Sequence, residues 1–169
     1  NIKEFQLIEG VGEAIKKINT AGILAVVTTN QPVLARGELK ELELKVIHNK
    51  MDTLLGRQGA YIDRIYYCPH HPDKGFKGEV KSLKFDCDCR KPEAGLFIHA
   101  KNDLNINLEE SWVVGDRTSD IMAAHNTGMR SVLVKTGYAG QDGKYDVKPD
   151  FIANDLKDAV EKILKVLKK

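Results

Sequence analysis

The stretch WVVGDRTSD, residues 112–120, changes from one kind of structure to another within nine positions. Residues 112–114 are large and apolar, as in a buried strand, and Gly115 and Asp116 end that run. From Thr118 to Thr127 the pattern is helical, and Gly128 follows where a helix would end. A short buried strand leading directly into a helix is typical of parallel α/β sheets.

The same alternation extends in both directions from this stretch. Apolar, mostly β-branched runs predict strands at residues 23–28, 62–67, 112–114, 131–134 and 151–153. Helical periodicity predicts helices at residues 11–22, 38–55 and 118–127. Two further helices are expected to begin near residue 92 and at residue 154 or 155. We therefore expect an α/β fold, a Rossmann-like parallel sheet with helices on both faces and an inserted loop at 68–92. In such sheets the ligand site lies beyond the carboxyl ends of the strands, which points to residues 28–36, 68–92 and 115–120.

Composition limits the class of partner. The 169 residues suit one domain, and 26 basic against 24 acidic residues give a net charge of only +2. Nucleic acid is therefore not an expected partner, because a strongly basic face is usual there. No apolar stretch approaches the roughly 18 residues of a membrane span, so no membrane association is expected. Three closely spaced cysteines do not form a disulfide framework, which favours a reducing, cytoplasmic compartment.

The three cysteines lie with a histidine in the long segment 68–92. Cys68-Pro69-His70 is followed, sixteen residues later, by Cys87-Asp88-Cys89. Three thiolates and one imidazole form a closed ligand set that zinc favours in structural sites. We predict that Cys68, His70, Cys87 and Cys89 bind a structural zinc ion. The neighbouring His71 is an alternative ligand, and reduced thiols without a metal are the alternative to a site.

Asp116 and Asp120 stand four residues apart, just after the strand at 112–114. A carboxylate at that end of a parallel strand can hold Mg²⁺ beside a phosphate group. Capping of the following helix, with Asp120 favouring the positive end of the helix dipole, explains the same residues equally well.

Two other polar segments lie at the expected sheet edge. Thr29, Asn30 and Gln31 end an apolar strand with groups that can donate to phosphate oxygens, although a polar turn would look the same. Arg90 and Lys91 follow the cysteines directly, and their charges suit a phosphate ligand. The alternative is a solvated basic pair before a helix.

Four stretches carry a resemblance to a known family: TTNQPVLARGE at 28–38, YYCPHHPDKGF at 66–76, CDCRKPEAGLF at 87–97 and VVGDRTSDIMAA at 113–124. Together they resemble motifs II, III and IV of the haloacid dehalogenase-like phosphatases, with the zinc loop of one branch. That branch holds heptose bisphosphate phosphatases and histidinol-phosphate phosphatases. The 68–79 and 30–38 segments are more similar to the heptose side, especially to versions fused to a sugar nucleotidyltransferase domain.

The resemblance implies a role for each matching residue. Thr29 and Asn30, with Gln31, would bind the transferring phosphoryl group, and Lys91 would neutralise its charge. Asp116 would ligate a catalytic Mg²⁺, and Asp120 would support the site without touching the ion. Arg90 and Arg117 would contact the substrate. Pro32 departs from the family pattern and removes one backbone N–H from the phosphate-binding turn.

A larger departure concerns the nucleophile. The family attacks phosphorus with the first Asp of a D-x-D-x-T motif on a central first strand, and this motif is absent from residues 1–169. We therefore expect residues 1–169 to be a single phosphatase domain that is N-terminally incomplete, with its nucleophile upstream of Asn1. The resemblance implies a Mg²⁺-dependent phosphatase acting on the 7-phosphate of a heptose 1,7-bisphosphate through an aspartyl-phosphate. Alternatives are a histidinol-phosphate phosphatase and a non-catalytic, zinc-stabilised binding domain.

Overall fold

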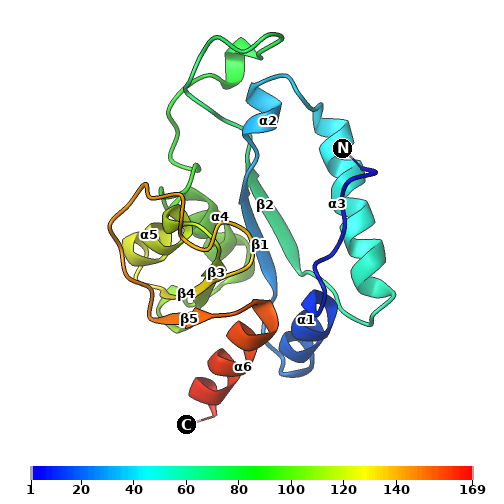
Figure 1. Cartoon of the computed structure of the whole chain (residues 1–169), viewed down its shortest axis with the longest axis vertical. Helices are drawn as coiled ribbons and strands as arrows, with labels where there is room; N and C mark the ends of the chain where they lie inside the picture. Colours follow the sequence, from blue (N-terminus) through cyan, green and yellow to red (C-terminus); the bar gives the residue numbers. More distant parts are fainter. Residues whose placement is uncertain (1, 169) are drawn as a thin grey trace. The chain divides into compact units, whose positions relative to one another are not determined.

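The computed structural model describes residues 2–168, and the chain divides into two compact units, residues 1–90 and 91–169. Each unit has its own parallel sheet (Figure 1). The expected fold class is confirmed, with the strands distributed over two sheets in the described residues.

The first unit pairs two strands in parallel, with Val26 of β1 opposite Arg64 of β2 and Asn30 opposite Cys68. Both strands therefore end at the same edge, where Asn30 and Cys68 are neighbours. The elements in chain order are α1 (Val11–Thr20), β1 (Val26–Asn30), α2 (Pro32–Ala35), α3 (Glu41–Gly56), β2 (Arg64–Cys68) and a 3-10 turn, η1 (Lys81–Leu83).

The second unit has three parallel strands in the order β3-β4-β5. Its elements are α4 (Gly95–Leu104), a 3-10 turn, η2 (Leu108–Glu110), β3 (Trp112–Gly115), α5 (Thr118–Asn126), β4 (Arg130–Val134), β5 (Phe151–Ala153) and α6 (Leu156–Leu167). The strand predicted at 151–153 matches the observed one, and those at 112–114 and 131–134 each extend by one residue.

Alternate residues of β3 face different helices, as strand geometry requires. Val113 packs with Phe97 of α4 and Ala123 of α5 in one buried cluster. On the other face, Val114 packs against a cluster that includes Val132 of β4 and Ala159 of α6. Helices therefore cover both faces of this sheet, as the apolar runs of its strands predict.

Three local predictions need correction. The first strand begins at Val26 rather than Ile23 and extends to Asn30, and its five residues are half-buried instead of buried on both faces. Its ladder starts late because Ala25 donates to the Asp63 carboxylate just before the strands pair. Helix α2 was not predicted, since four residues are too few to show helical periodicity. The two helices expected from 38 and about 92 begin at Glu41 and Gly95.

None of the helices within residues 2–168 combines the length and apolar character needed to cross a bilayer.

Candidate active site and metal centre

The four predicted zinc ligands converge in the first unit. The ligand atoms of Cys68, His70, Cys87 and Cys89 all lie within 4.8 Å of one another. The sulfur of Cys89 is 3.2 Å from that of Cys68 and 3.3 Å from that of Cys87, and His70 Nδ1 is 3.3 Å from Cys89 Sγ. Tetrahedral zinc with Zn–S bonds of about 2.3 Å would set its sulfur atoms roughly 3.7 Å apart. The cluster therefore fits a zinc ion with small adjustments.

Electrostatics of the cluster suit a cation. Burial raises the pKa of the Cys68 and Cys89 thiols, so they resist ionisation unless a positive charge lies beside them. Burial also lowers the pKa of His70, which keeps its imidazole neutral and able to ligate a metal. A divalent cation would supply the charge that the buried sulfurs require.

The cluster is tied to the end of β1. Cys68 ends β2 beside Asn30, and the backbone N–H of Gln31 donates to the Cys68 carbonyl at 2.8 Å. Arg90 Nη1 donates to the carbonyl of His70 at 3.2 Å. Holding the cysteines in place therefore holds both the Asn30–Gln31 turn and the Arg90 guanidinium.

His71 lies outside the sulfur cluster. Its Nε2 is 3.3 Å from Arg36 Nη2 and 3.6 Å from Asp73 Oδ2. The structure thus brings His70 and not His71 to the cysteines. Burial is the main cause that lowers the pKa of His71, and the nearby Arg90 guanidinium lowers it further.

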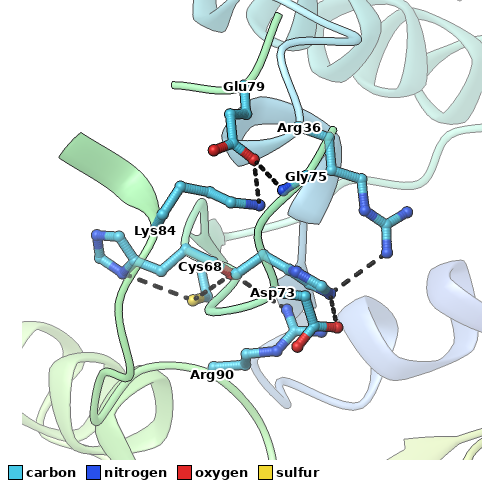
Figure 2. A network of polar contacts seen from close by, with 9 residues as sticks. Arg36, Cys68, Asp73, Gly75, Glu79, Lys84 and Arg90 are labelled. Carbon is cyan, nitrogen blue, oxygen red and sulfur yellow. Dashed lines mark hydrogen bonds and ion pairs between the residues drawn. The ribbon is translucent and has the colours of Figure 1, made fainter. Parts of the chain in front are cut away.

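A second set of contacts holds the rest of this segment, residues 68–90, which we call the Cys/His loop. Arg36 and Lys84 lie over the ring of Phe76, at 4.8 and 4.6 Å from its centre. Glu79 accepts from the backbone N–H of Gly75, as Figure 2 shows, and also from that of Phe76. Arg36 follows α2, so these cation–π contacts join the tip of the loop to the segment after the turn that Thr29, Asn30 and Gln31 form.

Thr29, Asn30 and Gln31 lie together at the end of β1. Gln31 Nε2 donates to Thr29 Oγ1 at 3.2 Å. The backbone N–H of Gln31 is already engaged with Cys68, and Pro32 is the first residue of α2 and has none. Phosphate contacts from this turn would therefore come from side chains more than from these two backbone positions.

In the second unit, Lys91 and Asp120 form a close ion pair. Lys91 Nζ is 2.7 Å from Asp120 Oδ1, and the two side chains are only 11% and 9% exposed. The other carboxylate oxygen, Oδ2, accepts from the backbone N–H of Arg117 at 3.1 Å. Asp120 therefore has both oxygens occupied and is placed to orient Lys91 and the start of α5. A side chain at Gly115 would collide with Asp120, so the glycine permits this close approach.

Asp116 follows β3 and is held by a loop that the sequence did not associate with it. Its Oδ2 accepts from the backbone N–H of Tyr138 at 2.8 Å, and its carbonyl accepts from Gly140 at 2.8 Å. This arrangement leaves Oδ1 as the oxygen that can turn toward a cation, so the carboxylate fits a magnesium site with few protein ligands. Arg117 stacks on the ring of Tyr138 at 3.5 Å.

The predicted site residues are thus divided between the two units. The first carries Thr29, Asn30, Gln31, Arg90 and the four cluster ligands, and the second carries Lys91, Asp116, Arg117 and Asp120. Tyr138 and Asp142 were missed, because their contacts with residues 116–118 use a loop whose only signal was its glycines at 137, 140 and 143.

Comparisons with known proteins agree with these motifs. The family described as "HAD-hyrolase-like" matches residues 88–159. The chain is 42% identical over 161 residues to the D-glycero-beta-D-manno-heptose-1,7-bisphosphate 7-phosphatase of Haemophilus ducreyi, covering 94% of this chain and 85% of the relative. The protein of the same name from Escherichia coli K12 is 36% identical over 166 residues, with 97% and 84% covered.

A solved structure is similar over the same extent. The D,D-heptose 1.7-bisphosphate phosphatase from B. bronchiseptica, complexed with magnesium and phosphate, has a TM-score of 0.85 and 30% identity. The match covers 98% of this chain and 88% of that one. The fold and the site therefore define a haloacid dehalogenase-like phosphatase. Within that class, the chain belongs to the D-glycero-beta-D-manno-heptose-1,7-bisphosphate 7-phosphatase family.

Proposed function

We propose that this chain hydrolyses the 7-phosphate of D-glycero-D-manno-heptose 1,7-bisphosphate in a Mg²⁺-dependent reaction. The observation that carries the proposal is the 42% identity to a phosphatase of that name over 85% of its length. The match takes in the segments that hold Thr29, Lys91 and Asp116. A histidinol-phosphate phosphatase remains the alternative within the enzyme class, and a non-catalytic binding domain the alternative outside it.

Each residue has a task in this reaction. Thr29 and Asn30, with Gln31, bind the phosphoryl group that is transferred, and Lys91 neutralises the charge on its oxygens. Asp120 keeps the Lys91 ammonium in one position through their ion pair. Arg90 and Arg117 contact the rest of the substrate.

Asp116 is the protein ligand for Mg²⁺, which when bound supplies positive charge beside the phosphate oxygens. The Cys68, His70, Cys87 and Cys89 cluster binds zinc as a structural ion. Because Cys68 and His70 hold the Gln31 backbone and Arg90, zinc orders two substrate-binding segments without joining the chemistry.

The attacking carboxylate comes from outside residues 1–169 in this proposal, because these residues contain no D-x-D-x-T motif. That Asp forms the aspartyl-phosphate, and residues 1–169 alone release no phosphate. Reduced cysteines that bind zinc favour a cytoplasmic location.

The test is phosphate release by the natural full-length protein, with heptose 1,7-bisphosphate and histidinol phosphate compared at equal concentration. We expect a preference for the heptose and dependence on Mg²⁺. Asp116→Asn should lower kcat/KM by about 10²–10³, the usual loss when one electrostatic contact to the reacting group is removed. Asp146→Asn, an exposed charge change in the same unit, is the matched control.

A preference for histidinol phosphate would show that the heptose is not the substrate and that the protein is a histidinol-phosphate phosphatase. Absence of phosphate release from both compounds, with zinc bound and the protein folded, would favour the non-catalytic domain.

A further inference from the structure

The segment between β4 and β5, residues 135–150, packs onto the residues that follow β3. We call it the β4–β5 loop. Besides the two N–H groups that reach Asp116, its Asp142 carboxylate lies at the start of α5. Gly137, Ala139 and Gly140 adopt left-handed backbone conformations, with φ of 75°, 52° and 76°. A non-glycine residue in that region is unfavourable, so tertiary contacts must hold the loop in this shape.

Asp142 makes the side-chain contacts that anchor the loop. Its Oδ1 accepts from the backbone N–H of Thr118 at 2.8 Å, and its Oδ2 accepts from Thr118 Oγ1 at 2.9 Å. The backbone N–H of Tyr145 then donates to the same Thr118 hydroxyl at 3.3 Å. Two hydrogen bonds to one carboxylate fix both its position and its orientation.

The anchored loop fixes the orientation of Asp116. The N–H groups of Tyr138 and Gly140 come from the part of the loop that lies between β4 and Asp142, and both point to Asp116. Gly137 lies so close that a side chain there would collide with Oδ2. The loop thus selects one rotation of the Asp116 carboxylate, with Oδ2 against the loop.

We propose that Asp142 is a positioning residue for Asp116 and that it raises the affinity of the site for Mg²⁺. It acts by fixing the loop whose Tyr138 N–H donates to Asp116 Oδ2. The Asp116 carboxylate is then held in one rotamer, with Oδ1 available to the cation. Asp142 does not touch the cation or the substrate. This inference rests on the proposed role of Asp116 as a magnesium ligand.

Two variants separate position from charge. Asp142→Ala removes both contacts to Thr118. In Asp142→Asn the amide oxygen can still accept from the Thr118 N–H, and the amide nitrogen can donate to Thr118 Oγ1. Asp146→Asn removes one charge from an exposed position of the same loop and serves as the control for charge alone.

The experiment uses the full-length protein with two readouts: Mn²⁺ binding followed by electron paramagnetic resonance, and the Mg²⁺ concentration that half-saturates phosphate release. For Asp142→Ala we expect both dissociation and half-saturation constants to rise about 10-fold or more, as for other residues that orient a metal ligand. Its kcat at saturating Mg²⁺ should stay within about threefold of wild type, since the ligand itself is present. Asp142→Asn and Asp146→Asn should remain close to wild type.

A second measurement follows the loop directly. Amide hydrogen exchange at residues 138–140 should be faster in Asp142→Ala than in wild type. Should Asp142→Ala fail to fold, Thr118→Val removes the hydroxyl that meets Oδ2 and the Tyr145 N–H but keeps the backbone bond to Oδ1, so the same changes are expected to a smaller extent.

The results discriminate between this inference and the proposed function. Unchanged Mn²⁺ affinity in a folded Asp142→Ala protein, or wild-type protein that binds no Mn²⁺ at all, would overturn the positioning role. A loss of affinity in Asp142→Asn and Asp146→Asn alike would also overturn it, because charge would then explain the effect. If the wild-type protein binds Mn²⁺ more tightly than Asp142→Ala but releases no phosphate from the heptose, the positioning role stands and the proposed reaction fails.

Discussion

The Cys/His loop of the first unit and the β4–β5 loop of the second are two long connections that hold candidate site residues by different means. The first brings together an imidazole and three thiols, two of them buried and one partly exposed, a set suited to a metal ion. The second uses a carboxylate and backbone N–H groups that are paired within the protein. We therefore expect the first loop to depend on a bound ion for its order, and the second to depend on contacts within the protein.

Zinc binding is where we expect the two loops to differ most. His70→Gln should lose tightly bound zinc and several kcal/mol of stability, because zinc binding to such sites is worth about 10–16 kcal/mol in folding. His71→Gln is the matched control, since the adjacent histidine contacts Arg36 and Asp73 instead of the sulfurs. It should keep zinc and cost about 1–2 kcal/mol, a typical value for a buried substitution.

Zinc content by elemental analysis and urea unfolding measure both effects. Hydrogen exchange should rise across residues 68–90 in His70→Gln and remain unchanged across 135–150. Loss of zinc from His71→Gln with retention in His70→Gln would show that the ligand assignment is wrong.

The complementary change affects the β4–β5 loop. Gly137→Ala places a methyl group against Asp116 Oδ2 and forces alanine into a left-handed conformation. Gly143→Ala imposes a similar left-handed conformation, with φ of 56°, at a position where nothing lies within 4 Å of the added carbon. Both should lose about 1–2 kcal/mol from the backbone alone, and Gly137→Ala roughly 1–3 kcal/mol more from overpacking.

The decisive readout is the Mg²⁺ requirement. Gly137→Ala should need more Mg²⁺ for half-maximal phosphate release, while Gly143→Ala should match wild type, and both should retain full zinc content. Equal Mg²⁺ requirements in the two variants would contradict a role for the Gly137–Asp116 approach.

The sequence anticipated the first loop far better than the second, for a physical reason. The residue type alone indicates metal binding at Cys68, Cys87 and Cys89, because reduced cysteines that cluster in one loop are usually metal ligands. Tyr138 meets Asp116 through its backbone N–H, which every residue except proline carries, so no side chain marks it. Asp142 looked like any other loop carboxylate.

The strand boundaries also depend on contacts that the sequence pattern does not reveal. The strands of the second unit were predicted to within one residue at each end. Helices cover both faces of that sheet, so each strand is a continuous apolar run whose ends are easy to recognise. Strand β1 was misplaced by three residues at its start, where apolar residues precede the first ladder pair. Periodicity records which residues are apolar, whereas the ladder depends on contacts such as that between Ala25 and Asp63.

A smaller effect tests whether the Cys/His loop depends on metal alone. Phe76→Leu removes the ring that both Arg36 and Lys84 contact, and two cation–π contacts are together worth about 1–3 kcal/mol. Phe85→Leu makes the same change in the same loop, where the ring is half-exposed and faces His70. We expect Phe76→Leu to lose more stability in urea unfolding than Phe85→Leu, with zinc retained in both. Equal losses would mean that the tip of the loop gains little from the cations, and that zinc alone accounts for its order.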